Sequence, residues 1–136
     1  ARLNMAKLHE KAGRLEMGRA NFKEAEGFLR KAVDLAPPWA APRLYLGELR
    51  RRQGRTEEAF ALLDAVSKER PEWPEGHYTY GRLLVDLGRK GEAADRWQVA
   101  ERRGMDVRRR LEDDGRPAGV VLRDDRGPGV RDDQQG

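Results

Sequence analysis

The chain has 136 residues and a formal net charge of +4; 38% of the residues are charged, but only 7% are aromatic. So few large side chains favour a thin, layered architecture over one broad core. The absence of cysteine excludes a disulfide framework and a thiolate zinc site.

Other simple features narrow the kind of protein further. His9 and His77 are too far apart in sequence to form a local ligand pair, so we expect neither a metal site nor a cofactor. No run of about 18 apolar residues occurs, which predicts no membrane span. The lack of a signal peptide favours the cytoplasm without identifying a compartment. Because the chain begins at Ala1 and not at methionine, it is consistent with a piece of a longer protein.

The sequence repeats itself at intervals of 34 residues. Leu15, Leu49 and Leu83 share one position of this repeat. Further positions match in the same way: Ala25, Ala59 and Ala93; Ala32, Val66 and Ala100; Gly54 and Gly88; Pro37 and Pro71; Trp39 and Trp73. So many matches at one spacing indicate three copies of one structural unit.

Each copy is predicted to form two helices, because its apolar residues recur at helical spacing. In chain order the expected helices cover residues 6–19, 22–36, 40–53, 56–70, 74–87 and 90–103. Gly54 and Gly88 are expected at the turn within a copy, where positive φ favours glycine. Pro37 and Pro71 are expected between copies, where proline ends one helix and can begin the next.

A short capping helix is predicted next, over residues 106–114, with Asp106 as its N-cap and Gly115 as its stop. It should cover the last repeat thinly, which leaves apolar surface near Trp97 for a partner, a second copy or the tail. Residues 115–136 are rich in Gly, Arg and Asp and are predicted to be flexible, with 120–122 as the segment that docks if any does. The expected organisation is thus a repeat domain over residues 1–104, a capping helix within 105–114 and a tail.

The order of small and large residues in the second and third copies resembles the tetratricopeptide repeat signature. The second copy carries it in Leu46, Gly47, Gly54, Ala59, Leu63, Val66 and Pro71, and the third in Tyr80, Gly81, Leu84, Gly88, Ala93, Trp97 and Ala100. The resemblance implies an all-α fold, a right-handed α-solenoid of three stacked helix-turn-helix repeats at about 6–39, 40–73 and 74–104. The implied structural positions are Gly13, Ala25, Ala32, Pro37, Gly47, Gly54, Ala59, Pro71, Gly81, Gly88, Ala93 and Trp97.

In tetratricopeptide repeat proteins the first helices line a concave groove, so the resemblance implies that this face meets a partner. The implied partner-binding residues are Lys7, Lys11, Arg14, Leu44, Tyr45, Glu48, Arg51, Arg52, Glu75, Tyr78, Thr79 and Arg82. Tyr45 and Tyr78 either offer flat anchors or cover the groove wall, and the arginines offer forked donors that suit an extended, partly acidic peptide. The lysine and asparagine set with which some members grip a terminal carboxylate is absent.

The leading prediction is a non-catalytic interaction module, an adaptor or assembly scaffold, that binds a protein or peptide. No side chain is placed to activate a histidine, so no catalytic residue is assigned. One alternative is the regulatory or substrate-recruiting arm of a larger enzyme or of a secretion or assembly component. Self-association through the edge of the C-terminal repeat is a further expectation. Nucleic-acid binding through Arg50–Arg52 and Arg108–Arg110 is disfavoured, because neither run is interleaved with stacking aromatics.

Overall fold

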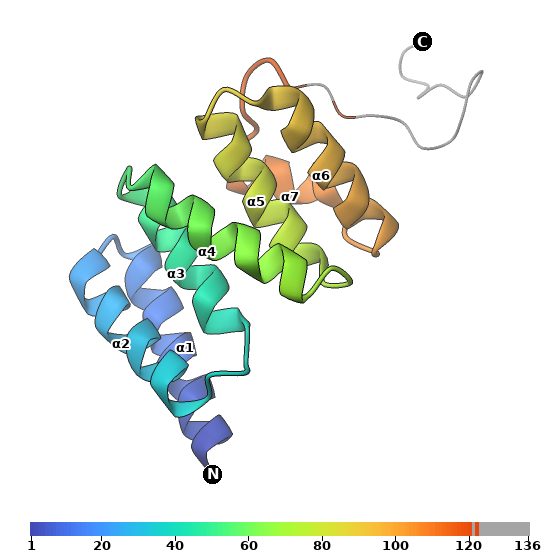
Figure 1. Ribbon diagram of the computed structural model, residues 1–136. Helices are drawn as coiled ribbons and strands as arrows, with labels where there is room; N and C mark the ends of the chain where they lie inside the picture. Colours follow the sequence, from blue (N-terminus) through green and yellow to red (C-terminus); the bar gives the residue numbers. More distant parts are fainter. Residues whose placement is uncertain (121, 123–136) are drawn as a thin grey trace.

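The computed structural model describes residues 1–120 and 122, and this part of the chain consists of α-helices without strands (Figure 1). The helices are α1 (Arg2–Gly18), α2 (Phe22–Leu35), α3 (Ala41–Arg52), α4 (Thr56–Glu69), α5 (Pro74–Asp86), α6 (Lys90–Arg102) and α7 (Val107–Asp114). The all-α prediction is confirmed, and each expected helix is present. Flexibility was expected for residues 115–136, of which 121 and 123–136 lie outside the described residues.

Helix α1 begins at Arg2, whereas the repeat predicted a start near residue 6. The junctions before α3 and α5 contain Pro37 and Pro71, and proline interrupts a helix because it lacks an amide hydrogen. Leu3 occupies the corresponding position in the first copy. Without a proline there, α1 gains an additional helical turn.

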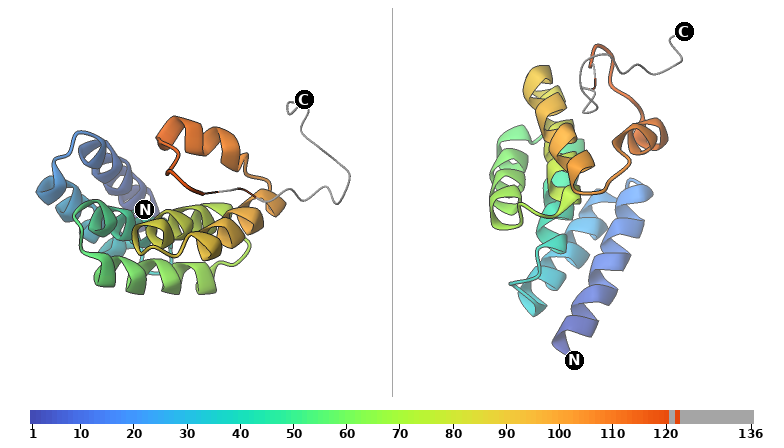
Figure 2. Two further views of the ribbon diagram at one scale, coloured as in Figure 1. Left: turned by 90° about the horizontal axis from the view of Figure 1, so that it is seen from above. Right: turned by 90° about the vertical axis from the view of Figure 1, so that its right-hand side faces the viewer.

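Three helix pairs, α1–α2, α3–α4 and α5–α6, follow one another along the molecule (Figure 1). Each pair packs on the next, because α2 contacts α3 and α4 contacts α5. Seen from above, α7 lies on the same side of the stack as α1 (Figure 2). This arrangement places α3 and α5 between α1 and α7.

Small residues allow the two helices of each pair to approach closely. Ala59 and Ala93 are fully buried. A Cβ atom on Gly47 would lie 2.6 Å from Leu63 Cδ2, and a Cβ atom on Gly81 would overlap the ring of Trp97. Real Cβ atoms do not make such short contacts, so both positions require glycine for this packing.

The apolar core continues from the second and third pairs into α7. Leu63, Trp97, Val107 and Leu111 belong to one cluster, and none is more than 1% exposed. Val120 and Leu122 are half-buried and pack against the same cluster, whereas residue 121 lies outside the described part of the chain. The surface near Trp97, for which we expected a partner, a second copy or the tail, is thus covered by α7 and by Val120 and Leu122 of the chain itself.

The turn between α1 and α2 places an alanine in a backbone conformation that favours glycine. Ala20 has a φ of +63°, whereas Gly54 and Gly88 occupy the same repeat position with a φ of +77°. The left-handed region costs a residue with a Cβ about 1–2 kcal/mol, which exceeds the entropy that glycine loses on folding. We expect Ala20→Gly to raise the free energy of unfolding by about 0.5 kcal/mol and Gly54→Ala to lower it by about 1 kcal/mol. Urea denaturation measures both, and changes of the same sign would contradict this explanation.

Candidate binding site

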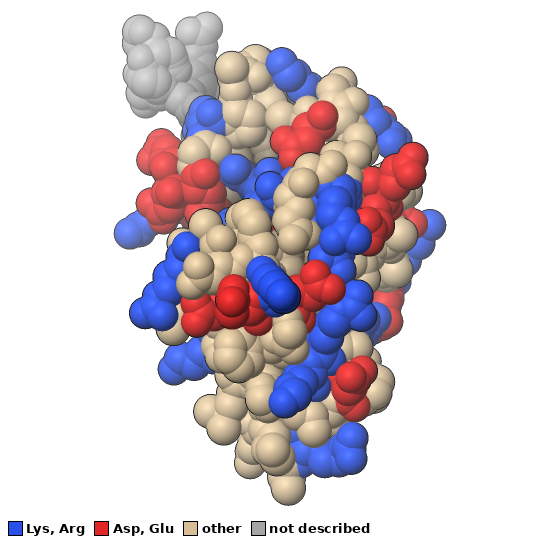
Figure 3. Space-filling model, turned by 90° about the vertical axis from the view of Figure 1, so that its left-hand side faces the viewer, with Lys and Arg blue, Asp and Glu red and all other residues tan. Residues whose placement is uncertain are grey.

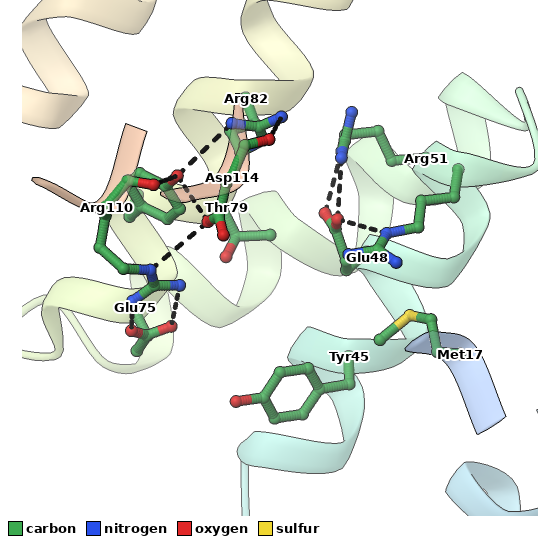
Figure 4. Close-up of a pocket in the computed structure, with 11 residues that line it drawn as sticks. Met17, Tyr45, Glu48, Arg51, Glu75, Thr79, Arg82, Arg110 and Asp114 are labelled. Carbon is green, nitrogen blue, oxygen red and sulfur yellow. Dashed lines mark hydrogen bonds and ion pairs between the residues drawn. The ribbon is translucent and has the colours of Figure 1, made fainter. Parts of the chain in front are cut away.

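A hollow of about 220 Å³ is bounded by α1, α3, α5 and α7 (Figure 4). Its lining consists of Met17, Tyr45, Glu48, Arg51, Arg52, Glu75, Tyr78, Thr79, Arg82, Arg110 and Asp114. Eight of these are residues that the sequence predicted for the groove. The structure adds Met17 from α1 and two residues from α7, Arg110 and Asp114.

The lining residues of α3 lie on one face of the helix because of their spacing. Tyr45, Glu48 and Arg52 follow one another at intervals of three and four residues, and such residues project from the same side of an α-helix. On α5, Glu75, Thr79 and Arg82 are spaced in the same manner. Helical periodicity thus groups these residues on one face of each helix, and the contact between α3 and α5 brings the two groups to the same hollow.

Four predicted groove residues do not line the hollow. Leu44 is only 1% exposed and belongs to the same core cluster as residues of α4 and α5. Lys7 and Lys11 are exposed on α1. The Arg14 guanidinium lies 5.1 Å from the centroid of the Tyr45 ring and therefore covers one face of that tyrosine.

Helix α7 covers Tyr78, which is 1% exposed. The Tyr78 hydroxyl donates to Asp114 Oδ2 at 2.8 Å, and the Arg110 guanidinium lies 4.5 Å from the centroid of the ring. Burial, followed by the bond to Asp114, raises the pKa of Tyr78 to about 12. Of the two roles considered for Tyr78, a flat anchor or a cover of the groove wall, the first is not available while α7 is docked, because the chain's own helix occupies that surface.

Two arginines join α7 to α5. Arg110 pairs with Glu75, and both side chains line the hollow (Figure 4). Arg82 donates to the main-chain carbonyls of Gly115 at 3.1 Å and Asp114 at 3.3 Å. The end of α7 is thus bound by α5 through charge-assisted hydrogen bonds, which are stronger than neutral ones.

Glu48 organises the α3 side of the hollow. It accepts hydrogen bonds from Arg51 at 2.8 and 2.9 Å and from Arg52 at 2.9 Å. Burial acts to raise the pKa of Glu48, but the hydrogen bonds and charges of these arginines outweigh it and hold the pKa below its ordinary value. Arg51 also donates to Asp86 at 3.1 Å. The Arg52 side chain remains 43% exposed and accessible to a ligand.

The histidines are engaged in structural contacts. His77 is 4% exposed, and its Nε2 donates to the carbonyl of Pro71 at 2.7 Å. His9 stacks on Phe28 with the ring centroids 6.1 Å apart.

Within residues 1–120 and 122, no group of three or more acidic, cysteine or histidine side chains is arranged to hold a metal ion. In the same part of the chain, no helix combines the length and the apolarity needed to cross a bilayer.

The basic run on α3 is engaged with carboxylates. Arg50 is only 5% exposed and bonds to Glu26 at 2.8 Å, while Arg51 and Arg52 bond to Glu48. On the face drawn in Figure 3, basic and acidic side chains are interspersed and do not separate into one basic patch. These pairings leave the run poorly suited to a phosphate backbone, which attracts unpaired basic groups.

The stacked hairpins and the lined hollow define a helical-repeat protein. A family model described as tetratricopeptide repeat matches residues 16–83, which is half of the 136-residue chain. The chain belongs to this family, so the resemblance seen in the sequence is confirmed.

Several solved structures share the fold. The tetratricopeptide repeat domain of Sgt2 from Aspergillus fumigatus has a TM-score of 0.67 and 15% identity, over 96% of this chain and 93% of that one. The Yersinia enterocolitica type III secretion translocator chaperone SycD has a TM-score of 0.68 and 13% identity, over 82% and 86%. MamA has a TM-score of 0.61 and 17% identity over 72% of this chain, which spans 57% of the MamA chain. Among curated proteins, no relative matches.

Proposed function

We propose that this chain is a non-catalytic interaction module whose concave face binds an extended, partly acidic segment of another protein. The supporting observation is how α5 holds the end of α7. Tyr78 binds the Asp114 carboxylate, and Arg82 binds two main-chain carbonyls. An acidic peptide offers the same two kinds of acceptor, so α5 has the chemistry to hold one.

The charges of the hollow favour an acidic ligand. Its lining contains four arginines and three carboxylates. Arg52 is 43% exposed, and half-buried Tyr45 lies on the same face of α3. An arginine beside an amphipathic ring offers directed donors and a flat contact surface, a pair of features common at protein interfaces.

The relatives support the class of function by their fold alone. SycD is a chaperone for a type III secretion translocator, and the Sgt2 match is a tetratricopeptide repeat domain. A fold does not determine a ligand, so the partner chemistry proposed for this chain depends on its own side chains.

Selection from a displayed library of random peptides tests this proposal. We expect the enriched peptides to contain Asp and Glu, and a synthetic copy should bind the wild-type chain in a fluorescence anisotropy titration. The variant that combines Tyr45→Ala with Arg52→Ala should bind it about tenfold more weakly, since buried aromatic and arginine contacts dominate interfaces. Arg30→Ala is the matched control, because its side chain is 63% exposed on α2. Equal affinity of all three proteins would reject the proposed site.

A further inference from the structure

The face of α1 that points away from α2 is apolar and uncovered. Met5, Leu8 and Leu15 are 51%, 69% and 54% exposed, respectively. Together with half-buried Ala12, they follow one another at intervals of three, four and three residues. This spacing places all four side chains in one stripe, which we call the α1 stripe.

The repeat indicates what this face does in the other helix pairs. Leu15 corresponds to Leu49 and Leu83, which are both 0% exposed. Ala12 corresponds to Leu46 and Tyr80, which are 9% and 5% exposed. In α3 and α5 this face packs against α2 and α4. The α1 stripe is therefore a helix-packing face that carries no helix among the described residues.

The residues before the α1 stripe do not form the usual junction between repeats. A turn that contains proline connects α2 to α3, and another connects α4 to α5, with Pro37 and Pro71 at equivalent positions. Leu3 replaces this proline, and α1 stays helical through it. The additional turn instead extends the stripe to Met5. The proline turn that connects α2 to α3 and α4 to α5 therefore has no counterpart among the first residues of α1.

The opposite end of the array offers no matching face for end-to-end stacking. Ala94 and Trp97 on α6 are 6% and 0% exposed, and Val120 and Leu122 pack against the same cluster. A second copy that stacked its α1 on α6 would have to displace these residues. Pairing of one α1 with another leaves this end intact.

We propose that the α1 stripe is a self-association surface through which two copies pair as antiparallel α1 helices. The spacing of the stripe is the same when read in either direction. With the two-fold axis near Glu10, Met5 meets the partner's Leu15 and Leu8 meets the partner's Ala12. Such a contact uses the same patch on both copies and closes as a dimer. One helix pair buries less than the roughly 800 Å² per partner of a standard interface, so we expect a dissociation constant of about 1–100 μM.

Analytical ultracentrifugation over a concentration series spanning about 1–500 μM tests the proposal. The full chain should change reversibly from monomer to dimer, and the variant with Leu8→Glu and Leu15→Glu should remain monomeric throughout. Both side chains are exposed in the single chain, so this variant should keep its helix content and melting temperature. Leu87→Glu, at a leucine that is 38% exposed after α5, should still dimerise. A strict monomer, or a dimer that survives Leu8→Glu with Leu15→Glu, would overturn the proposal.

Single cysteines then report the orientation, because the natural chain contains none. When Leu8→Cys and Ala12→Cys chains are mixed with oxidised glutathione, a disulfide should form between one chain of each variant. Leu15→Cys alone should not cross-link, since ten residues of helix separate the two copies of this position by about 15 Å, beyond disulfide reach. Rapid cross-linking of Leu15→Cys to itself would contradict the antiparallel pairing.

Discussion

Replacing Trp97 by alanine is expected to lower the free energy of unfolding by about 3–5 kcal/mol, which is a large part of the stability of a domain of this size. The side chain is 0% exposed, and its Nε1 donates to the Tyr78 carbonyl at 3.0 Å. Alanine would leave both a cavity and a buried carbonyl without its donor. Chemical denaturation followed by circular dichroism measures the loss. Trp39→Ala, at a half-buried junction position, should lose less than half as much.

Gly81 provides an internal check on this explanation. A Cβ atom there would overlap the Trp97 ring, and the hydrogen bond from Trp97 restricts how far the ring can move. Gly81→Ala should therefore be clearly destabilising in the wild-type chain but nearly neutral when combined with Trp97→Ala. Double-mutant cycles isolate this coupling. Additive effects of the two changes would contradict the packing described here.

Leu111→Asp is expected to release α7 and to cost about 2–4 kcal/mol, because it places a charge where Leu111 is 1% exposed. Once α7 has left, Tyr78 loses its cover and its bond to Asp114. Its pKa should fall from about 12 towards the ordinary value near 10. NMR titration of isotope-labelled tyrosine, assigned with Tyr78→Phe, measures the change. An unchanged pKa would mean that α7 is not what covers this residue.

The burial of Tyr78 under α7 also affects the stability of the fold at alkaline pH. The folded chain holds the Tyr78 proton more tightly than the unfolded chain does, because the pKa is raised to about 12 on folding. The resulting stabilisation is complete below about pH 10 and is lost as the pH rises from about 10 to about 12. Leu111→Asp should remove this part of the pH dependence. If an acidic segment binds where α7 lies, the variant should also bind the selected peptide more tightly, because binding no longer has to displace a docked α7.

The repeat made most of the fold predictable. Leu15, Leu49 and Leu83 recur at a fixed interval, and glycines and prolines mark the turns, so local chemistry determines where each helix begins and ends. The exception was the start of α1, where Leu3 replaces a proline. The missing proline is visible in the sequence, but the sequence alone does not show that residues 2–5 continue the helix.

The candidate site was predictable only where one helix supplies it. Tyr45, Glu48 and Arg52 could be grouped because their spacing places them on one face of α3. The contacts of α7 could not be found in this way, because Arg110 meets Glu75 and Asp114 meets Tyr78 across more than 30 residues of chain. The face of α7 that contacts α5 is determined by the packing of Val107 and Leu111 in the core, and no motif indicates it.

Amide hydrogen exchange with and without a saturating acidic peptide from the displayed library tests the binding of a partner on the concave face most directly. We predict slower exchange in α3 and α5, around the hollow lined by Tyr45 and Arg82, together with altered exchange in α7. Helices α2 and α4 should exchange at the same rates in the free and bound chain. Protection confined to α2, α4 and α6 would place the ligand on the other side of the stack and contradict the proposed site.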